Sequence, residues 1–186
     1  MNSRTRRLRS AYLLVAMAAG VTLISNVRAQ QAPKQEVPNN IAIPAAPEQP
    51  LPFNHKAHVS RGVQCTLCHV NPDPGAQMTL PATTVCMGCH QNVAKDRPSI
   101  IKLAALANSN TPIPWVRVYQ ITQGVTWTHR KHLQAGLQCV MCHGAVGEME
   151  TMSQATAVLA MGSCINCHQS HNAPVVCQTC HAWPKD

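Results

Sequence analysis

Five Cys-x-x-Cys-His motifs use every cysteine in the chain, and they restrict what it can fold into more than any other feature. In each motif a histidine directly follows the second of two cysteines that stand three positions apart. The ten cysteines are Cys65, Cys68, Cys86, Cys89, Cys139, Cys142, Cys164, Cys167, Cys177 and Cys180, and the five histidines are His69, His90, His143, His168 and His181. This is the attachment signal for c-type haem, in which both thiols bond to the haem and the histidine binds iron. The sequence therefore predicts five covalently bound haems.

Two other uses of paired cysteines have to be weighed. A disulfide framework would have varied spacings and would not need a histidine after each pair. A zinc site would account for one or two pairs rather than five. The same spacing recurs five times, always with histidine, which favours haem over both alternatives.

The composition is poor in the side chains that build ordinary cores. The 186 residues include one Phe, two Tyr and three Trp, but fourteen Pro. Aromatic side chains usually dominate a core, so bound porphyrins would have to supply much of the buried apolar surface. We expect a mainly irregular and α-helical fold, with short helices around a covalent haem core and little β structure.

The remaining histidines match the number of iron positions still to be filled. Five lie outside the haem motifs: His55, His58, His129, His132 and His171. We therefore predict that every iron has two histidine ligands. Met78 and Met152 are alternative ligands, because methionine can also bind haem iron; packing against porphyrin is the interpretation that we favour for both.

An internal repeat organises the chain. The pattern His-x-x-His followed by Cys-x-x-Cys-His begins at His55 and returns at His129, 74 positions later, and Met78 and Met152 keep the same offset. We predict a Pro-rich linker (30–52) that acts as a spacer, a dihaem module (53–91), a connector with a short helix that Ser99 caps (92–126), and a trihaem module (127–186). Residues 116–121 could form an edge strand.

The N-terminus resembles an export segment. Arginines precede an apolar run, and small residues stand where a signal peptidase cleaves. Because this run is shorter than the ~20 residues that span a bilayer, residues 1–29 are either a cleaved signal peptide or an N-terminal anchor. Both place the protein on the periplasmic side of the cytoplasmic membrane, with the soluble periplasm as a possible location.

The net charge of +8 is not evidence for nucleic-acid binding. Five of the fifteen basic residues lie in the predicted export segment, and haem propionates would add negative charge. No stripe of basic residues with interleaved aromatic side chains is present, so we expect no nucleic-acid partner.

The pattern Phe53-x-His55-x-x-His58 with the following haem motif resembles the cytochrome c3/c7 class of small multihaem carriers. In that class the first histidine of the pair binds the haem just downstream and the second binds a later one. The resemblance implies the pairs His55–His69, His58–His90, His129–His143, His132–His168 and His171–His181. It covers residues 53–91 and 127–181.

A more specific resemblance rests on this duplicated arrangement, on Pro-Trp-Val-Arg-Val at 114–118, and on the sequence 161–168 around the fourth motif. These features are similar to the pentahaem subunit of alternative complex III, a bacterial quinol-oxidising membrane complex. The resemblance implies iron–sulfur, integral quinol-site and monohaem cytochrome or oxidase partners at a membrane. It also implies electron transfer without catalysis by this chain. A free periplasmic carrier is the alternative, and a multihaem oxidoreductase is a third possibility.

Overall fold

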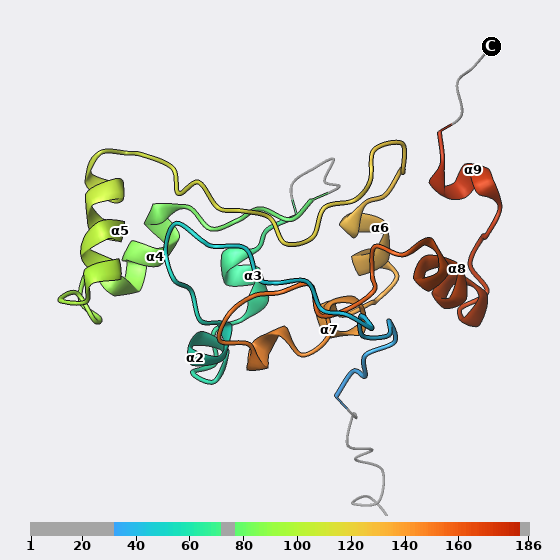
Figure 1. Cartoon of the computed structure of the whole chain (residues 1–186), viewed down its shortest axis with the longest axis horizontal. Helices are drawn as coiled ribbons and strands as arrows, with labels where there is room; N and C mark the ends of the chain where they lie inside the picture. Colours follow the sequence, from blue (N-terminus) through green and yellow to red (C-terminus); the bar gives the residue numbers. More distant parts are fainter. Residues whose placement is uncertain (1–31, 72–76, 183–186) are drawn as a thin grey trace, which may run out of the picture. The chain divides into compact units, whose positions relative to one another are not determined.

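Short helices joined by long irregular segments make up the described part of the chain, residues 32–71 and 77–182 of a computed structural model (Figure 1). Two isolated antiparallel bridges, Asn39 with Thr156 and Val125 with His181, are its only β pairings. The predicted α-helical and irregular fold with little β structure agrees with this architecture. The helices are α2 (His55–Val59), α3 (Cys65–Cys68), α4 (Thr83–His90), α5 (Pro98–Asn108), α6 (His129–Gln134), α7 (Cys139–His143), the 3-10 turn η1 (Val146–Glu148), α8 (Met161–Ser170) and α9 (Cys177–Cys180).

Each haem motif lies on one of these helices. The cysteine pairs occupy α3, α4, α7, α8 and α9. The motif histidine is the last residue of α4 and α7, lies in the last turn of α8, and directly follows α3 and α9. Residues three apart lie on the same face of a helix. One helical turn is therefore enough to present both thiols of a motif in the same direction.

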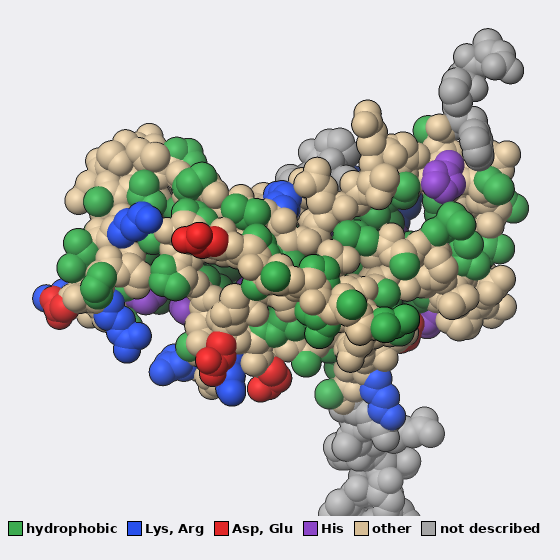
Figure 2. All heavy atoms as spheres, in the orientation of Figure 1, with side chains coloured by type: hydrophobic (Ala, Val, Ile, Leu, Met, Phe, Trp, Pro, Cys, Tyr) green, Lys and Arg blue, Asp and Glu red, His purple; other side chains and the backbone are tan. Residues whose placement is uncertain are grey.

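Few hydrophobic side chains are buried in the described residues. Four are buried: Val37, Leu51, Leu103 and Ile113. Many large ones are exposed, and Figure 2 shows hydrophobic side chains spread over the visible face of the molecule. Protein atoms alone thus provide a small core, as the composition predicted.

The largest hydrophobic cluster holds α5 against α4. Leu51, Leu103 and Ile113 form its centre. The predicted connector helix is present, but it begins at Pro98, and Arg97 rather than Ser99 is its N-cap residue. Proline at the first helical position has a φ suited to the helix and needs no amide partner, which explains the earlier start.

The segment that was predicted to be a spacer lies along the rest of the chain. The amides of Glu36 and Val37 donate to the carbonyl of Met141 (3.0 Å each), and the amide of Asn40 donates to Ala155 (2.8 Å). The Asn40 side chain donates to the carbonyl of Thr156 (2.9 Å). We call residues 35–40 the N-terminal strap.

Residues 116–121 form no strand, contrary to the sequence prediction. At Val116 the backbone pairs with a side chain instead: its amide donates to Gln49 Oε1 (3.0 Å), and its carbonyl accepts from Gln49 Nε2 (2.8 Å). A glutamine amide offers one donor and one acceptor, so it satisfies this backbone without a neighbouring strand.

The predicted export segment (1–29) lies outside the described residues. Within residues 32–71 and 77–182, no helix is both long and apolar enough to cross a membrane.

Candidate haem-binding sites

Backbone carbonyls orient three of the motif histidines. The ring Nδ1 of His69 lies 2.8 Å from the carbonyl of Thr79, that of His90 lies 2.9 Å from Val93, and that of His168 lies 2.7 Å from Pro174. A carbonyl can only accept, so Nδ1 must be the protonated nitrogen in each contact. Nε2 then keeps the lone pair that a metal needs.

Two short helices present the histidines upstream of the motifs. Asn54 caps α2 and Thr128 caps α6, each through its side chain, and these caps hold the helices in place. The carbonyls of the same two residues accept from Nδ1 of His58 (2.8 Å) and of His132 (2.9 Å). Nε2 of both histidines is thereby left available as a ligand atom.

The structure brings together four of the five histidine pairs that the c3/c7 resemblance implies. Their ring centroids are separated by 6.5 Å for His55–His69, 6.1 Å for His58–His90, 6.3 Å for His129–His143 and 6.1 Å for His132–His168. The rings are nearly parallel in the first and third pairs, at 13° and 14°. They are inclined in the other two, at 67° and 44°.

These separations fit an iron between each pair. Imidazoles that bind a metal from opposite sides through Nε2, at the roughly 2 Å typical of such bonds, have ring centroids about 6 Å apart. Residues in ordinary ring-to-ring contact lie closer together, as Trp127 and His129 do at 4.2 Å. The geometry therefore suits two axial ligands per haem, and the ligand roles themselves stay predictions.

One aromatic residue packs on both histidines of each short helix. The Phe53 ring contacts His55 (4.8 Å) and His58 (4.5 Å). Trp127 occupies the corresponding place two residues before His129 and contacts that ring and the His132 ring. Edge and stacked contacts of this kind restrict ring rotation, which keeps the two histidines directed at different partners.

Burial keeps two of the paired histidines neutral. Desolvation, with smaller effects from His129 and His69, lowers the pKa of His143 to about 4. Burial also lowers the pKa of His55, and His69 and His58 add to this effect. Only the neutral ring can bind a metal, so both side chains are in the right form at neutral pH.

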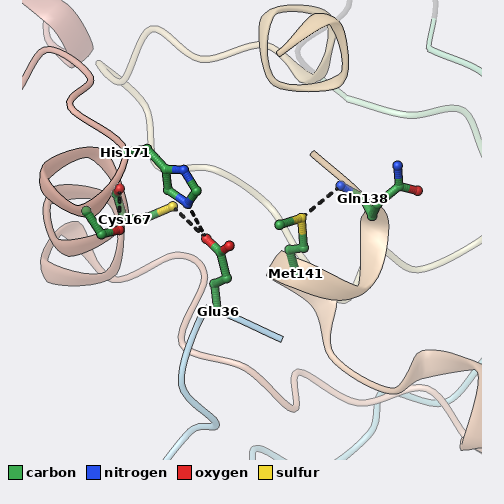
Figure 3. Close-up of polar contacts among 6 residues, drawn as sticks. Glu36, Gln138, Met141, Cys167 and His171 are labelled. Carbon is green, nitrogen blue, oxygen red and sulfur yellow. Dashed lines mark hydrogen bonds and ion pairs between the residues drawn. The ribbon is translucent and has the colours of Figure 1, made fainter. Parts of the chain in front are cut away.

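His171 contacts a carboxylate of the N-terminal strap. Its Nε2 lies 2.7 Å from Oε2 of Glu36 in the N-terminal strap, and the Cys167 thiol donates to the same oxygen at 3.6 Å (Figure 3). No ring contact joins His171 to His181 in the described residues. The nitrogen that the predicted fifth pair requires is therefore engaged by a carboxylate.

The cluster of Glu36, Cys167 and His171 is a poor metal site, although its donor atoms lie within 4.8 Å of one another. Burial raises the pKa of Cys167, and the hydrogen bond to Glu36 and the charge of that carboxylate raise it further. Metal binding at this thiol would have to displace its proton, and a raised pKa makes that less favourable.

All ten cysteines are free thiols in the structure. Burial, followed by the charges of neighbouring Cys167 and Glu36, raises the pKa of Cys142 to about 11.

The two methionines are half-buried. The carbonyl of Met78 accepts from Arg117 Nη1 at 3.1 Å. This contact involves the Met78 backbone and not its sulfur. It therefore does not distinguish an iron ligand from a side chain that packs on porphyrin.

Sequence reasoning missed the side chains that surround the third motif. Tyr119 packs edge-on against the His143 ring (4.9 Å). Thr156 is fully buried, its hydroxyl donates to the carbonyl of Cys142 (2.7 Å), and it contacts the Tyr119 hydroxyl at 3.3 Å. Neither residue has a chemical signature of its own, and Tyr119 lies in a connector without haem motifs.

A comparison with known families supports haem binding in the second half of the chain, where two of the histidine pairs lie. Residues 125–182 match the family model described as cytochrome c7 and related cytochrome c. This segment spans α6 to α9 and contains three of the five haem motifs. The match supports a multihaem cytochrome of the c3/c7 kind, a class that binds haem covalently and transfers electrons.

No curated protein matches the chain.

Proposed function

We propose that the chain is a pentahaem c-type cytochrome that transfers electrons on the periplasmic side of the cytoplasmic membrane. The four histidine pairs with centroids 6.1–6.5 Å apart carry this proposal. When bound, each haem would supply a one-electron couple for transfer between neighbouring sites.

The protein's own part is to set ligation, orientation and burial. The His55, His58, His129 and His132 rings would supply the second ligands of four irons, and carbonyls that accept from Nδ1 orient three of their four partners. These hydrogen bonds, together with burial, adjust the reduction potential of each site.

The partner that we propose is a quinol-oxidising membrane complex of the alternative complex III kind. Two electrons from a quinol would enter one at a time, through an iron–sulfur subunit, and leave to a monohaem cytochrome or an oxidase. The sequence features that favour this assignment include residues 114–118. In the structure this stretch anchors to the dihaem module, because Trp115 Nε1 donates to the Pro81 carbonyl at 3.0 Å.

A free periplasmic carrier is the second candidate, favoured by the family match to cytochrome c7. Fractionation of native membranes, followed by identification of co-purifying subunits, separates the two. A cytochrome that is wholly soluble and purifies alone contradicts the complex assignment.

Haem content tests the proposal at its base. We expect five covalent haems by intact mass, a pyridine haemochrome of the c type, and a low-spin spectrum of the oxidised protein. A mass without covalent haem contradicts electron transfer by this chain, and a high-spin iron that binds substrate would favour an oxidoreductase instead.

A further inference from the structure

We propose that the five haem motifs stand in single file in the order 86–90, 65–69, 139–143, 164–168 and 177–181. The second and fifth motifs of the sequence are then the two ends, and the first motif is internal. This inference rests on the proposed function, because the order describes an electron path only if the motifs carry haem.

Two neighbour relations follow from the short histidine helices. His55 and His58 lie three residues apart on α2, and their rings face His69 and His90 respectively. The motifs 65–69 and 86–90 must therefore flank this one helix. On α6, His129 and His132 relate motif 139–143 to motif 164–168 in the same way.

The junction between the two modules joins motif 65–69 to motif 139–143. Helix α2 packs on η1, the turn that follows the third motif. The amide of Lys56 donates to the Met149 carbonyl (3.0 Å), and Val59 lies 3.0 Å from the position of a β-carbon on Gly147.

The cysteines agree with this junction. The Cys65 thiol lies close enough to Cys139 to add, after burial, to the raised pKa of Cys139 through its charge and hydrogen bonding. On the other side of the same motif, Cys68 contributes to the raised pKa of Cys86, again after burial. The two thiols of motif 65–69 thus approach different neighbours, which is the arrangement of an internal member of a file.

The fifth motif follows the fourth directly. The ring of His168 donates to the Pro174 carbonyl (2.7 Å), which holds the connection to α9 against α8. Cys180 lies close enough to Cys164 to contribute to its raised pKa after burial. Because the two histidines of α6 face His143 and His168, motif 164–168 stands between the third and the fifth motifs.

Figure 1 agrees with this order along its horizontal direction. Helix α4 is followed by α3, then by α7, and α8 and α9 come last, with α9 above α8 in the view. Sequence order alone would have made α3 an end. In the structure, a donor and an acceptor that use the whole path must approach α4 and α9.

The test is a redox titration of the intact holoprotein, followed by NMR of the haem methyl resonances. Distal-ligand variants His55→Met, His58→Met, His129→Met and His132→Met assign four sites, because each raises one potential, and the fifth is assigned by elimination. Electrostatic interaction between haems falls with distance. We expect the four largest pairwise interactions between consecutive members of the proposed file.

Two results would overturn the order. One is a larger interaction of motif 86–90 with 139–143 than with 65–69. The other is a fifth site coupled chiefly to any motif other than 164–168. Intact mass separates this failure from that of the function: five haems with another pattern reject only the order, whereas a chain without haem rejects the proposed function and the order together.

Discussion

Residues 53–69 and residues 127–143 hold the same set of groups in the same local arrangement, and we refer to them as the first and second copies. Each has a capped short helix, an aromatic ring on two histidines, and a nearly parallel pair of imidazoles at 13° or 14°. A glycine with positive φ, Gly62 or Gly136, ends each short helix region. The local sequence therefore specifies the ligand geometry, whereas descent by duplication stays a prediction.

The surroundings of the two copies differ. After the first motif comes Val70, which is exposed, and the His69 ring donates to the Thr79 carbonyl. The corresponding position in the second copy is Gly144, which lies under the N-terminal strap, and Tyr119 packs on the His143 ring. Equal ligand geometry is thus combined with unequal burial, which is a means of giving similar haems different potentials.

The largest expected effect tests the equality of the copies. We expect His55→Ala and His129→Ala each to convert one of five low-spin haems to a high-spin form, because each removes one axial ligand. EPR and the visible spectrum of the oxidised protein measure the fraction. His55→Met and His129→Met serve as controls that restore a ligand, and these should be low-spin with one potential raised by roughly 100 mV within the ~0.8 V that axial ligands span. A high-spin fraction in only one copy would contradict equal ligation.

Thr156 tests the difference in surroundings. Thr156→Val keeps the shape of the side chain but removes the donor to the buried Cys142 carbonyl, so we expect a loss of about 1–3 kcal/mol of stability. Thr79→Val in the dihaem module is the control. Its hydroxyl accepts from the Val70 amide at an exposed site (3.0 Å), so its removal should cost less. Denaturant unfolding of both holoproteins compares them, and equal losses would show that the second copy gains nothing from this buried contact.

How far the sequence could predict this molecule depends on whether a feature is local. The helical turns at the motifs follow patterns within a few residues, and the structure has a helical turn at each motif. The four histidine pairs join residues 14 to 36 positions apart. The resemblance to the c3/c7 class implied these pairs, and the structure brings their rings together. The N-terminal strap could not be predicted, because Glu36 and Asn40 contact residues more than a hundred positions away. Such contacts depend on which backbone groups the rest of the fold leaves unpaired, and the local sequence does not contain that information. The nearby prolines favoured the prediction of a spacer.

Gly144 tests whether the strap is the cause of the difference. Its φ is 69°, and a β-carbon there would lie 2.7 Å from Oε1 of Gln35 and 3.0 Å from the Thr156 methyl. Gly62 has a φ of 84° with open space around it. We expect Gly62→Ala to cost about 1 kcal/mol from backbone strain alone. Gly144→Ala should cost about 1 kcal/mol more, because strap and threonine must move.

Limited proteolysis near residue 35 provides a second measurement for the same pair. The strap should become cleavable in Gly144→Ala and stay protected in Gly62→Ala. Equal stability losses together with equal protection would mean that the strap adapts freely and does not constrain the second copy.

The smallest effect is expected at His171, the one predicted ligand without a counterpart in the first copy. Its ring is half-exposed and its Nε2 contacts Glu36. Exposed ion pairs contribute about 0–1 kcal/mol, so loss of the Glu36 contact in His171→Ala should lower stability only slightly and leave the spin state of every haem unchanged. Glu36→Gln is the matched control: it keeps the size of the side chain and removes the charge, and it should reproduce the small loss. If His171→Ala instead makes one haem in five high-spin while Glu36→Gln does not, His171 binds iron in the holoprotein, as the match between spare histidines and iron positions predicted. The appended fifth haem would then have a ligand pair of the same kind as the other four, despite having no equivalent in the dihaem module.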